Sequence, residues 1–465
     1  MKVKKGQILD IEVDDVAFGG KGLARIDGMA VFIDQAVAGD QVKALITRRR
    51  KSYAEARVLE ILKPSPDRIA APCPYSGTCG GCKWQFLRYA RQIEYKRRHV
   101  AESLAHIGGL PDVLVHPTLP ADPIFGYRNK MEFSCSDHRW LMPDEMQHGA
   151  IDRDFALGLH VPGTYHKVLD TKACLLQPDC GNLLLNRMRE EMRRSGRPPY
   201  GLRSHQGFWR FLMLRHSVAE DRWMVNIITS APDARLLGEI AARLVSENAQ
   251  VGAVVNNVTA RKAAIAVGES EILLAGAPCL RECIGPYQFE ISANSFFQTN
   301  TRSALRLYET AKRYAGLSGV ERVVDLYCGT GTIAIFLADQ ALEVIGIEMG
   351  ESAVADARRN SAANGVTNTR FVCGDARHTL GAIGFDAEVL IIDPPRDGMH
   401  ADVVKSILEL RPRRIVYISC NPATLARDLA LLKERYRAAE VQPVDMFPHT
   451  WHIEAVARLE LAGGR

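Results

Sequence analysis

Long hydrophobic runs are missing from this 465-residue sequence. A membrane-spanning helix needs roughly 20 consecutive apolar residues, and no stretch approaches that length. The basic start MKVKKGQILDIEV has no apolar run behind it, so we do not expect a signal peptide. Internal repeats and low-complexity tracts are absent as well. These absences argue against a membrane protein and favour a cytoplasmic globular protein.

A strong charge bias is also missing. The formal net charge is +5, and the chain has 47% hydrophobic and 24% charged residues, as an ordinary globular protein has. The overall balance therefore identifies no partner. Basic residues do cluster at 48–51 and along 83–98, which is typical of a phosphate-binding face but also of a solvated surface. The length predicts two or three domains.

Eleven cysteines are scattered along the chain, an odd number that is not typical of a disulfide framework. They indicate a reducing compartment, in which thiols act as metal ligands or nucleophiles. Cys73, Cys79 and Cys82 form a C-x5-C-x2-C pattern in a Gly- and Pro-rich loop. The pattern predicts a thiolate site for zinc or for a [4Fe–4S] cluster, and spacing alone does not choose between them. The candidates for the fourth ligand are Cys135, Cys174 and Cys180.

The first 62 residues contain short β-rich runs separated by Gly and Asp turn signals. Four or five strands in so short a segment predict a small closed β-barrel, the architecture in which oligonucleotide-binding folds occur. A Pro-rich joint near Lys63 then marks a domain boundary.

Apolar residues at helical spacing between Phe86 and Ile107 predict a helix, which Gly108 and Gly109 end. From about 125 to 290, strand-like runs accompany one long helix, which indicates a mixed α+β middle domain. After about residue 300, strands and helices alternate regularly. This rhythm predicts a parallel sheet covered on both faces, with ligands at the carboxyl ends of its strands.

The segment DLYCGTGT, residues 325–332, ends the first strand of that sheet and opens a helix. Its glycines permit a tight turn beneath a nucleoside, in a dinucleotide site or in an S-adenosylmethionine site. Three acids at successive strand ends favour S-adenosylmethionine. Asp325 would repel a pyrophosphate but suits a sulfonium. Glu348 can accept hydrogen bonds from ribose hydroxyls, and Asp375 is placed to meet the adenine amino group.

Two further strand ends carry Asp393, in IIDPPRDG, and Cys420, in YISCNP. Both residues should therefore lie at the edge of the sheet where the methyl donor is expected. C5 of uracil is too electron-poor to take a methyl group unaided, but attack of a thiolate on C6 activates it. A cysteine at this position predicts methylation of C5 of uracil, with a separate base that removes the C5 proton.

Five motifs together resemble the RNA uracil-C5 methyltransferases: FQTN, DLYCGTGT, DPPRDG, YISCNPATLARD and FPHTWHIE. The resemblance implies that Cys420 is the nucleophile and that Glu454 removes the C5 proton. Phe296 or Phe297 could stack on an extruded base, and Asp393 could accept the N3–H of uracil. The residues expected to line the cofactor and uracil pocket are Gln298, Tyr327, Thr332, Glu348, Asp375 and Asp393.

Two other segments extend the resemblance. The first 62 residues resemble a TRAM domain, and CPYSGTCGGCKWQ resembles the iron–sulfur loop of the subgroup that methylates large-subunit ribosomal RNA. This implies a [4Fe–4S] cluster bound by Cys73, Cys79, Cys82 and Cys174. It also implies RNA as the partner, with 23S ribosomal RNA favoured over transfer RNA and a loop or single-stranded uridine as target. We expect a monomer and no membrane association.

The expected fold is α/β, with a Rossmann-like methyltransferase domain, a small N-terminal β-barrel and an α+β middle domain that carries the iron–sulfur loop. The expected spans are 1–62 for the barrel, 63–90 and 123–292 for the middle domain, and 91–122 and 293–465 for the catalytic domain.

Alternative functions have their own sequence signals. Cytosine-C5 methyltransferases commonly have Pro-Cys in the fourth-strand motif, where this chain has Pro394 and Pro395. Methyltransferases of exocyclic amines have an aromatic residue at the position of Arg396. An RNA-binding module with an inactive methyltransferase fold is a further class, which the intact set of candidate site residues argues against.

Overall fold

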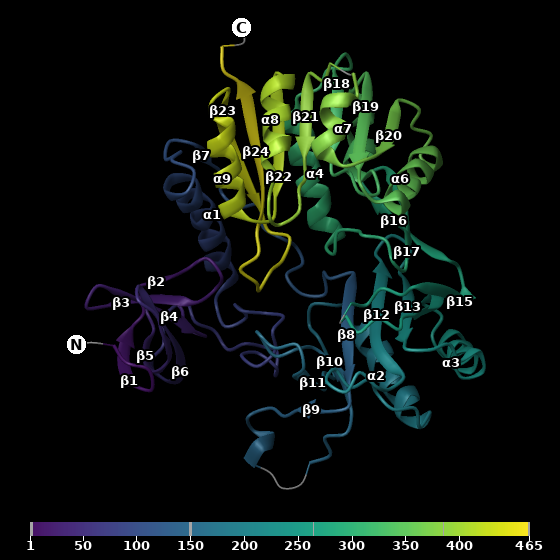
Figure 1. The fold of residues 1–465 in the computed structure, drawn as a ribbon. Helices are drawn as coiled ribbons and strands as arrows, with labels where there is room; N and C mark the ends of the chain where they lie inside the picture. The colour runs from purple at the N-terminus through teal and green to yellow at the C-terminus, as the bar shows by residue number, and fades with distance from the viewer. Residues whose placement is uncertain (1–2, 148–150, 264, 385, 464–465) are drawn as a thin grey trace.

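The computed structural model describes residues 3–147, 151–263, 265–384 and 386–463, and these form three units around separate sheets (Figure 1). The expected spans that begin at residue 1 and end at residue 465 extend beyond the described residues. Among the described residues, no helix is long and apolar enough to cross a membrane.

The first unit is a six-stranded sheet in the order β1-β5-β6-β4-β3-β2. In β5, alternate residues Val42, Ala44 and Ile46 are buried, so one face of the sheet encloses the core. The described sheet has six strands, more than predicted, because the short β2 and β3 give no clear alternation. The two ends of this order, β1 and β2, are separated only by Val13 and Asp14, whose backbone N–H groups donate to Asp40 and Leu23, so the sheet closes on itself as the predicted small barrel. The strands are β1 (Ile8–Glu12), β2 (Asp15–Val16), β3 (Gly22–Ile26), β4 (Met29–Asp34), β5 (Gln41–Arg49) and β6 (Tyr53–Lys63).

The middle unit is a mixed sheet in the order β10-β8-β12-β13-β14-β15, with helices packed against it (Figure 1). Leu184, Leu185 and Met188 of α2 and Ile240 and Leu244 of α3 enter the same core as the inward residues of the strands. The elements are β8 (Lys130–Ser136), β9 (Arg139–Trp140), η1 (Glu145–Gln147), β10 (Ala156–Gly158), β11 (Val168–Leu169), α2 (Asp179–Arg194), β12 (Trp209–Ser217), β13 (Arg222–Thr229), α3 (Ala234–Glu247), β14 (Val251–Val258) and β15 (Ser270–Gly276).

The third unit is an eight-stranded sheet in the order β20-β19-β18-β21-β22-β24-β23-β7. Successive residues of β18, Val323 and Val324, enter different cores, so helices cover both faces as predicted. The hairpin of β16 and β17 lies between this unit and the middle unit. The elements are β16 (Cys279–Ile284), β17 (Tyr287–Ser292), α4 (Thr301–Ala315), β18 (Arg322–Leu326), α5 (Thr332–Leu337), η2 (Ala338–Gln340), β19 (Glu343–Glu348), α6 (Glu351–Ala363), β20 (Thr369–Cys373), α7 (Ala376–Ala382), β21 (Val389–Ile392), α8 (Ala401–Leu410), β22 (Arg414–Ser419), α9 (Pro422–Leu432), β23 (Tyr436–Val444) and β24 (Glu454–Leu461).

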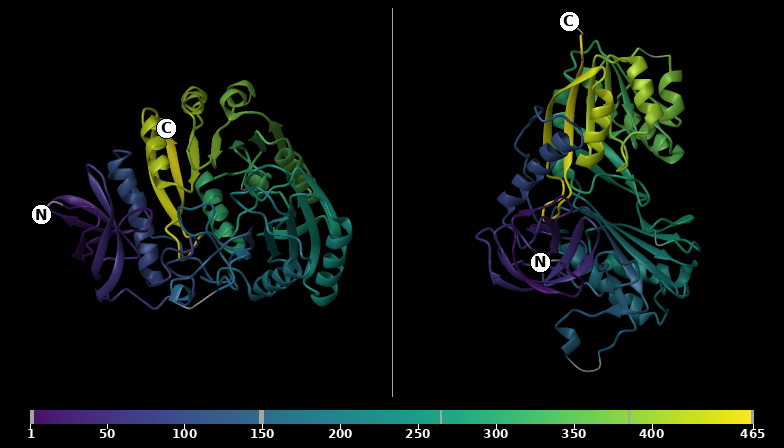
Figure 2. Two further views of the ribbon diagram at one scale, coloured as in Figure 1. Left: turned by 60° about the horizontal axis from the view of Figure 1, so that its bottom comes forward. Right: turned by 60° about the vertical axis from the view of Figure 1, so that its left-hand side comes forward.

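Helix α1 (Tyr89–His106) packs in the core of the third unit, and strand β7 (Leu114–Val115) pairs with β23 of its sheet. Both elements precede the middle unit in the chain. The first unit, drawn in purple, lies beside α1 (Figure 2). The predicted helix began too early, at about Phe86, because the apolar residues before Tyr89 pack in a loop. Phe86 and Leu87 join Trp84 in a small core there. The division into domains at the expected boundaries stays a prediction.

Candidate active site

The carboxyl edge of the third sheet borders a cavity of about 810 Å³. Strands β18, β19, β20, β21 and β22 run parallel and end at this edge. Strand β24 is antiparallel to β22, so its first residue reaches the same edge. The wall of this one cavity contains both expected catalytic residues and six of the residues expected to bind the cofactor or uracil: Gln298, Tyr327, Thr332, Glu348, Asp375, Asp393, Cys420 and Glu454.

The turn between β18 and α5 is held in a strained backbone conformation. Tyr327, Gly329 and Gly331 all have positive φ, and a Cβ at Gly331 would lie 2.8 Å from the ring of Phe371. Glu348 fixes the turn from the next strand, because its carboxylate accepts the backbone N–H of Gly329 at 3.2 Å. The glycines and Glu348 therefore fix the shape of this part of the cavity wall.

Asp325 differs from the sequence expectation. It is fully buried in β18 and is not among the residues that line the cavity. Burial raises its pKa well above the usual range, and nearby Asp393 adds to the increase. No hydrogen bond of ordinary geometry reaches either carboxylate oxygen among the described residues, although the backbone N–H of Ala334 opposes the increase. An unpaired buried carboxylate favours a cationic ligand nearby, which fits a sulfonium-bearing cofactor in this cavity.

Asp375 has a structural role as well as its place in the cavity wall. It is the N-cap of α7, and its carboxylate accepts the backbone N–H of Arg377 at 2.9 Å. The Arg377 side chain pairs with the same carboxylate and lowers the pKa of Asp375 to about 2. This residue is therefore ionised over the whole neutral range.

Cys420 and Glu454 face one another across neighbouring strands. Ser419 of β22 pairs with Ala455 of β24, so the next residue of one strand lies opposite the preceding residue of the other. Burial raises the pKa of Cys420 to about 11, the charge of Glu454 adds to the increase, and Arg396 opposes it. The thiol therefore needs its cationic neighbour to form a thiolate.

Two carboxyl groups of the cavity wall, those of the partly buried Asp393 and the buried Glu454, have raised pKa values. Burial raises the pKa of Asp393 to about 7. Burial also raises the pKa of Glu454 well above its usual range, and Asp393 adds to that increase. Close, buried acids disfavour each other's ionisation, so the cavity again favours a cation.

The structure identifies residues that the sequence interpretation missed. Arg396, Phe447 and His452 line this cavity, and all three also line a second one. Arg396 is visible in the DPPRDG motif, but from sequence it only argued against a methyltransferase of exocyclic amines. Both aromatic candidates line the cavity, but Phe296 is 70% exposed whereas Phe297 is 4% exposed and also packs in the core.

The second cavity, of about 470 Å³, is lined by the thiols of Cys73, Cys79, Cys82 and Cys174. The alternative fourth ligands lie elsewhere: Cys135 is buried against Met192, and Cys180 contacts Asn248. No group of three or more His, Cys, Asp or Glu residues within the described parts of the chain is arranged to hold a metal ion. The four cysteines therefore line one cavity, but within the described residues their side chains are not arranged around a common point where a metal ion would bind.

Backbone N–H groups point at several of these sulfurs. The N–H of Gly81 donates to Cys79 Sγ at 3.4 Å, and burial raises the pKa of Cys73 and Cys174 while backbone hydrogen bonds oppose that increase. Burial also raises the pKa of Cys79 to about 11 and of Cys82 to about 12. Amide donors around buried thiols fit thiolates that a metal or cluster neutralises.

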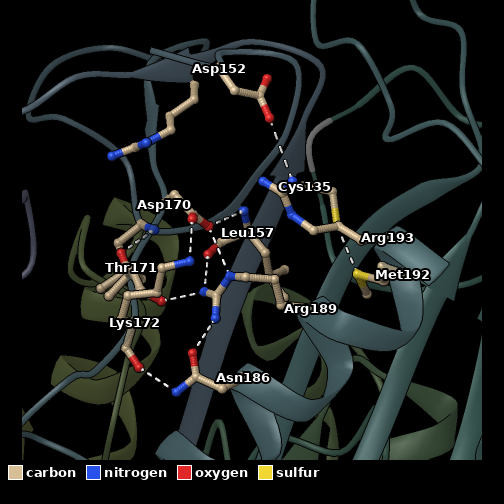
Figure 3. A network of polar contacts seen from close by, with 12 residues as sticks. Cys135, Asp152, Leu157, Asp170, Thr171, Lys172, Asn186, Arg189, Met192 and Arg193 are labelled. Atoms are coloured by element: carbon tan, nitrogen blue, oxygen red, sulfur yellow. Dashed lines mark hydrogen bonds and ion pairs between the residues drawn. The ribbon is translucent and has the colours of Figure 1, made fainter.

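Polar side chains on one face of α2 hold the segment that carries Cys174 (Figure 3). Arg189 pairs with Asp170 at 2.9 Å, and their side chains are only 5% and 3% exposed. Asn182 accepts the backbone N–H of Cys174 at 2.8 Å, and Asn186 binds the same segment between these two contacts. Residues 182, 186 and 189 repeat at helical spacing, so one helix face determines the path of the segment.

A parallel sheet covered on both faces, with an acidic cavity at its carboxyl edge, defines a methyltransferase of the S-adenosylmethionine-dependent class. Residues 284–461 match the family described as tRNA (uracil-5-)-methyltransferase, and residues 2–59 match the TRAM domain. The chain belongs to this uracil-5-methyltransferase family of RNA methyltransferases.

Similar proteins cover almost the whole chain. An RNA methyltransferase of Chlorobaculum tepidum is 43% identical over 99% of this chain and 98% of its own length. One of Porphyromonas gingivalis is 39% identical over 97% of this chain and 99% of its own. The structure of the Pyrococcus abyssi tRNA (uracil-54, C5)-methyltransferase in complex with S-adenosyl-L-homocysteine superposes with a TM-score of 0.76. It is 27% identical, and the match covers 97% of this chain and 99% of that one.

We expect the affinity for S-adenosylmethionine to rise as the pH rises through about 7, the pKa of Asp393. A bound cation lowers this pKa, so below about 7 binding must release a proton. Calorimetric titration at several pH values measures the effect. S-adenosylhomocysteine, which lacks the sulfonium charge, and the Asp393→Asn variant should both give a flatter profile. A constant ratio of the two ligands' affinities across this range would contradict the electrostatic interpretation.

We expect Asp170→Asn to destabilise the middle unit by about 3 kcal/mol, because the buried Arg189 loses its counter-charge. Chemical denaturation followed by tryptophan fluorescence measures the change. Asp152→Asn is the matched control, since Asp152 pairs with Arg193 at 3.6 Å with side chains 61% and 47% exposed (Figure 3). This control should have no measurable effect. Equal losses in the two variants would show that burial of the pair is unimportant.

Proposed function

We propose that this protein methylates C5 of a uridine in 23S ribosomal RNA, with a uridine of transfer RNA as the alternative substrate. The observation that carries the proposal is the juxtaposition of Cys420 and Glu454 in the wall of an acidic cavity. Methylation of an electron-poor ring carbon needs both groups, a nucleophile that activates the ring and a base that removes a proton.

In the first step the Cys420 thiolate attacks C6 of uracil. A sulfur–carbon bond forms, and the electrons of the C5–C6 double bond move onto C5 and the O4 carbonyl. Arg396 favours the attacking thiolate, because it lowers the thiol pKa that burial has raised. S-adenosylmethionine, when bound, supplies the electrophilic methyl group that C5 takes up.

In the second step Glu454 removes the proton from C5. The electrons of the broken C–H bond re-form the C5–C6 double bond, and the sulfur of Cys420 leaves C6 with its electron pair. Burial raises the pKa of Glu454 and so makes its carboxylate a stronger base than an exposed one. Asp393 accepts the N3–H of uracil, which a cytosine lacks, and Phe296 stacks on the extruded base.

The choice of 23S ribosomal RNA over transfer RNA rests on the joint presence of the TRAM domain and the four thiols of the second cavity. A loop or single-stranded uridine is the preferred target, because extrusion of a base from a duplex costs a few kcal/mol. We also propose that the enzyme is a monomer and retain the expected domain spans, since β6 ends at Lys63 and β7 pairs with β23.

We further propose a [4Fe–4S] cluster bound by Cys73, Cys79, Cys82 and Cys174, with zinc as the alternative. Their shared cavity and the amide donors to sulfur support this assignment. The cavity shares Arg396, Phe447 and His452 with the methyl-transfer cavity, so the cluster shapes the surface that RNA contacts. No redox step is needed for this role.

We expect the wild-type enzyme to form a stable covalent adduct with 5-fluorouridine-containing 23S ribosomal RNA, because fluorine cannot leave C5 as a proton. Cys420→Ala should abolish the adduct, and Glu454→Gln should accumulate a methylated adduct on ordinary RNA with turnover reduced by about 100-fold or more. Gel electrophoresis with methyl-labelled S-adenosylmethionine detects both species. The control Cys283→Ala, on the hairpin strand β16, should behave like the wild type. An adduct that survives Cys420→Ala would refute the mechanism, and preferential labelling of transfer RNA would favour the alternative substrate.

We expect removal of the metal by chelation to weaken binding of 23S ribosomal RNA more than binding of S-adenosylmethionine. Iron analysis measures the metal content, an RNA binding assay measures the affinity for RNA, and calorimetry measures the affinity for S-adenosylmethionine. Cys174→Ala should lose the iron, whereas Cys180→Ala, outside the cavity, should retain it. If the purified protein contains stoichiometric zinc, the four cysteines bind zinc and the [4Fe–4S] assignment is wrong. An equal loss of both affinities would mean that the metal supports the whole fold.

A further inference from the structure

The loop between β23 and β24, residues 445–453, supplies part of the wall of the methyl-transfer cavity. Phe447 and His452 of this loop line the cavity, and Glu454 follows directly. The loop has little regular structure of its own, and His449 adopts a positive φ of 66°. Its conformation must therefore be imposed by contacts with other parts of the chain.

Helix α1 makes those contacts through one face. Tyr89, Gln92 and Lys96 repeat at helical spacing and all bind the loop or its first residue, Asp445. Lys96 is the centre of the set. Its Nζ donates to Asp445 Oδ1 at 2.6 Å and to the backbone carbonyl of Phe447 at 3.0 Å.

The Lys96–Asp445 pair is completely buried, since both side chains are 0% exposed. The second oxygen of Asp445 accepts the hydroxyl of Tyr89 at 2.8 Å, and the first also accepts the backbone N–H of Phe447 at 3.0 Å. Both oxygens of Asp445 and two of the three ammonium N–H groups of Lys96 therefore have hydrogen-bond partners, which hold the buried pair in one arrangement.

The same helix face also connects the loop to the cysteine segment. The side chain of Gln92 accepts the backbone N–H of His449 at 2.8 Å and donates to the carbonyl of Trp84 at 3.0 Å. The backbone N–H groups of Lys83 and Trp84 in turn donate to the carbonyl of His449. The loop is therefore held between α1 and the residues that follow Cys82.

We propose that Lys96 is a positioning residue of the methyl-transfer reaction, which acts through Asp445 and the 445–453 loop to place Glu454 for removal of the C5 proton. The inference rests on the proposed roles of Cys420 and Glu454. Lys96 touches neither substrate nor cofactor in this role. Nucleophilic attack depends on β22 and Arg396, which lie outside the loop, so Lys96 affects the second chemical step selectively.

Lys96→Met removes the charge and the donor to Phe447 at similar side-chain length. We expect turnover on ordinary 23S ribosomal RNA to fall by about 10-fold to 100-fold, because misplacement of a catalytic group by a fraction of an ångström has effects of that size. The methylated covalent adduct should accumulate on this RNA. Adduct formation on 5-fluorouridine-containing RNA should change by less than about threefold, and KM for S-adenosylmethionine by less than about twofold.

Three further variants separate positioning from stability. Tyr89→Phe keeps the ion pair and should give a smaller effect in the same direction. The double variant Lys96→Met with Asp445→Asn removes both buried charges, so it should recover thermal stability while proton removal stays slow. Glu102→Gln, which changes an exposed residue of α1, is the control and should match the wild type.

The outcomes distinguish this inference from the proposed function. If the wild type forms no adduct with 5-fluorouridine-containing RNA, the proposed chemistry fails. If the wild type forms the adduct, equal losses of adduct formation and turnover in Lys96→Met and Tyr89→Phe would overturn the positioning role. Full recovery of turnover in the double variant would also overturn it, because neutralising the buried charge would then suffice.

Discussion

The register of the third sheet determines most of the properties of the methyl-transfer site. Five parallel strands end at one edge, and the antiparallel β24 begins there. Residues that lie up to 156 positions apart in the chain, from Gln298 to Glu454, meet in one cavity wall for this reason. A shift of β24 by one residue would turn Glu454 toward the opposite face of the sheet, because side chains alternate along a strand.

The electrostatics of the cavity follow from this convergence. Three acids at this edge, Asp325, Asp393 and Glu454, have raised pKa values, and among the described residues no cation pairs with the buried Asp325. Such a site is poorly stabilised alone and well stabilised by a cation. Arg396 lowers the pKa of the Cys420 thiol, whereas Glu454 and Asp393 raise it. The site thus favours both a cationic donor and an anionic nucleophile.

Helix α1 connects the three units. His99 contacts the backbone of Val16 in the first unit, Gln92 binds the segment that follows the cysteine loop, and Lys96 binds the loop that precedes Glu454. In the middle unit, α2 holds the Cys174 segment in a comparable way through Asn182, Asn186 and Arg189. In both cases polar residues at helical spacing fix a segment that has no regular structure of its own.

The sequence by itself was sufficient for the alternating strands and helices, for the acids at the strand ends, and for the convergence of eight expected residues on one cavity, although it missed Arg396, Phe447 and His452. These follow from local patterns, since the period of hydrophobic residues and the position of a motif after a strand are properties of short segments. The start of α1 was predicted too early for the same reason, because Phe86 and Leu87 fit the helical period but pack in a loop.

The tertiary structure alone decided the rest. It separated Cys174 from Cys135 and Cys180, removed Asp325 from the cavity wall, and revealed the role open to Arg396. It also paired Lys96 with Asp445, which lie 349 residues apart. No local pattern encodes such a contact, because burial of a charge is stable only when a distant part of the chain supplies its partner.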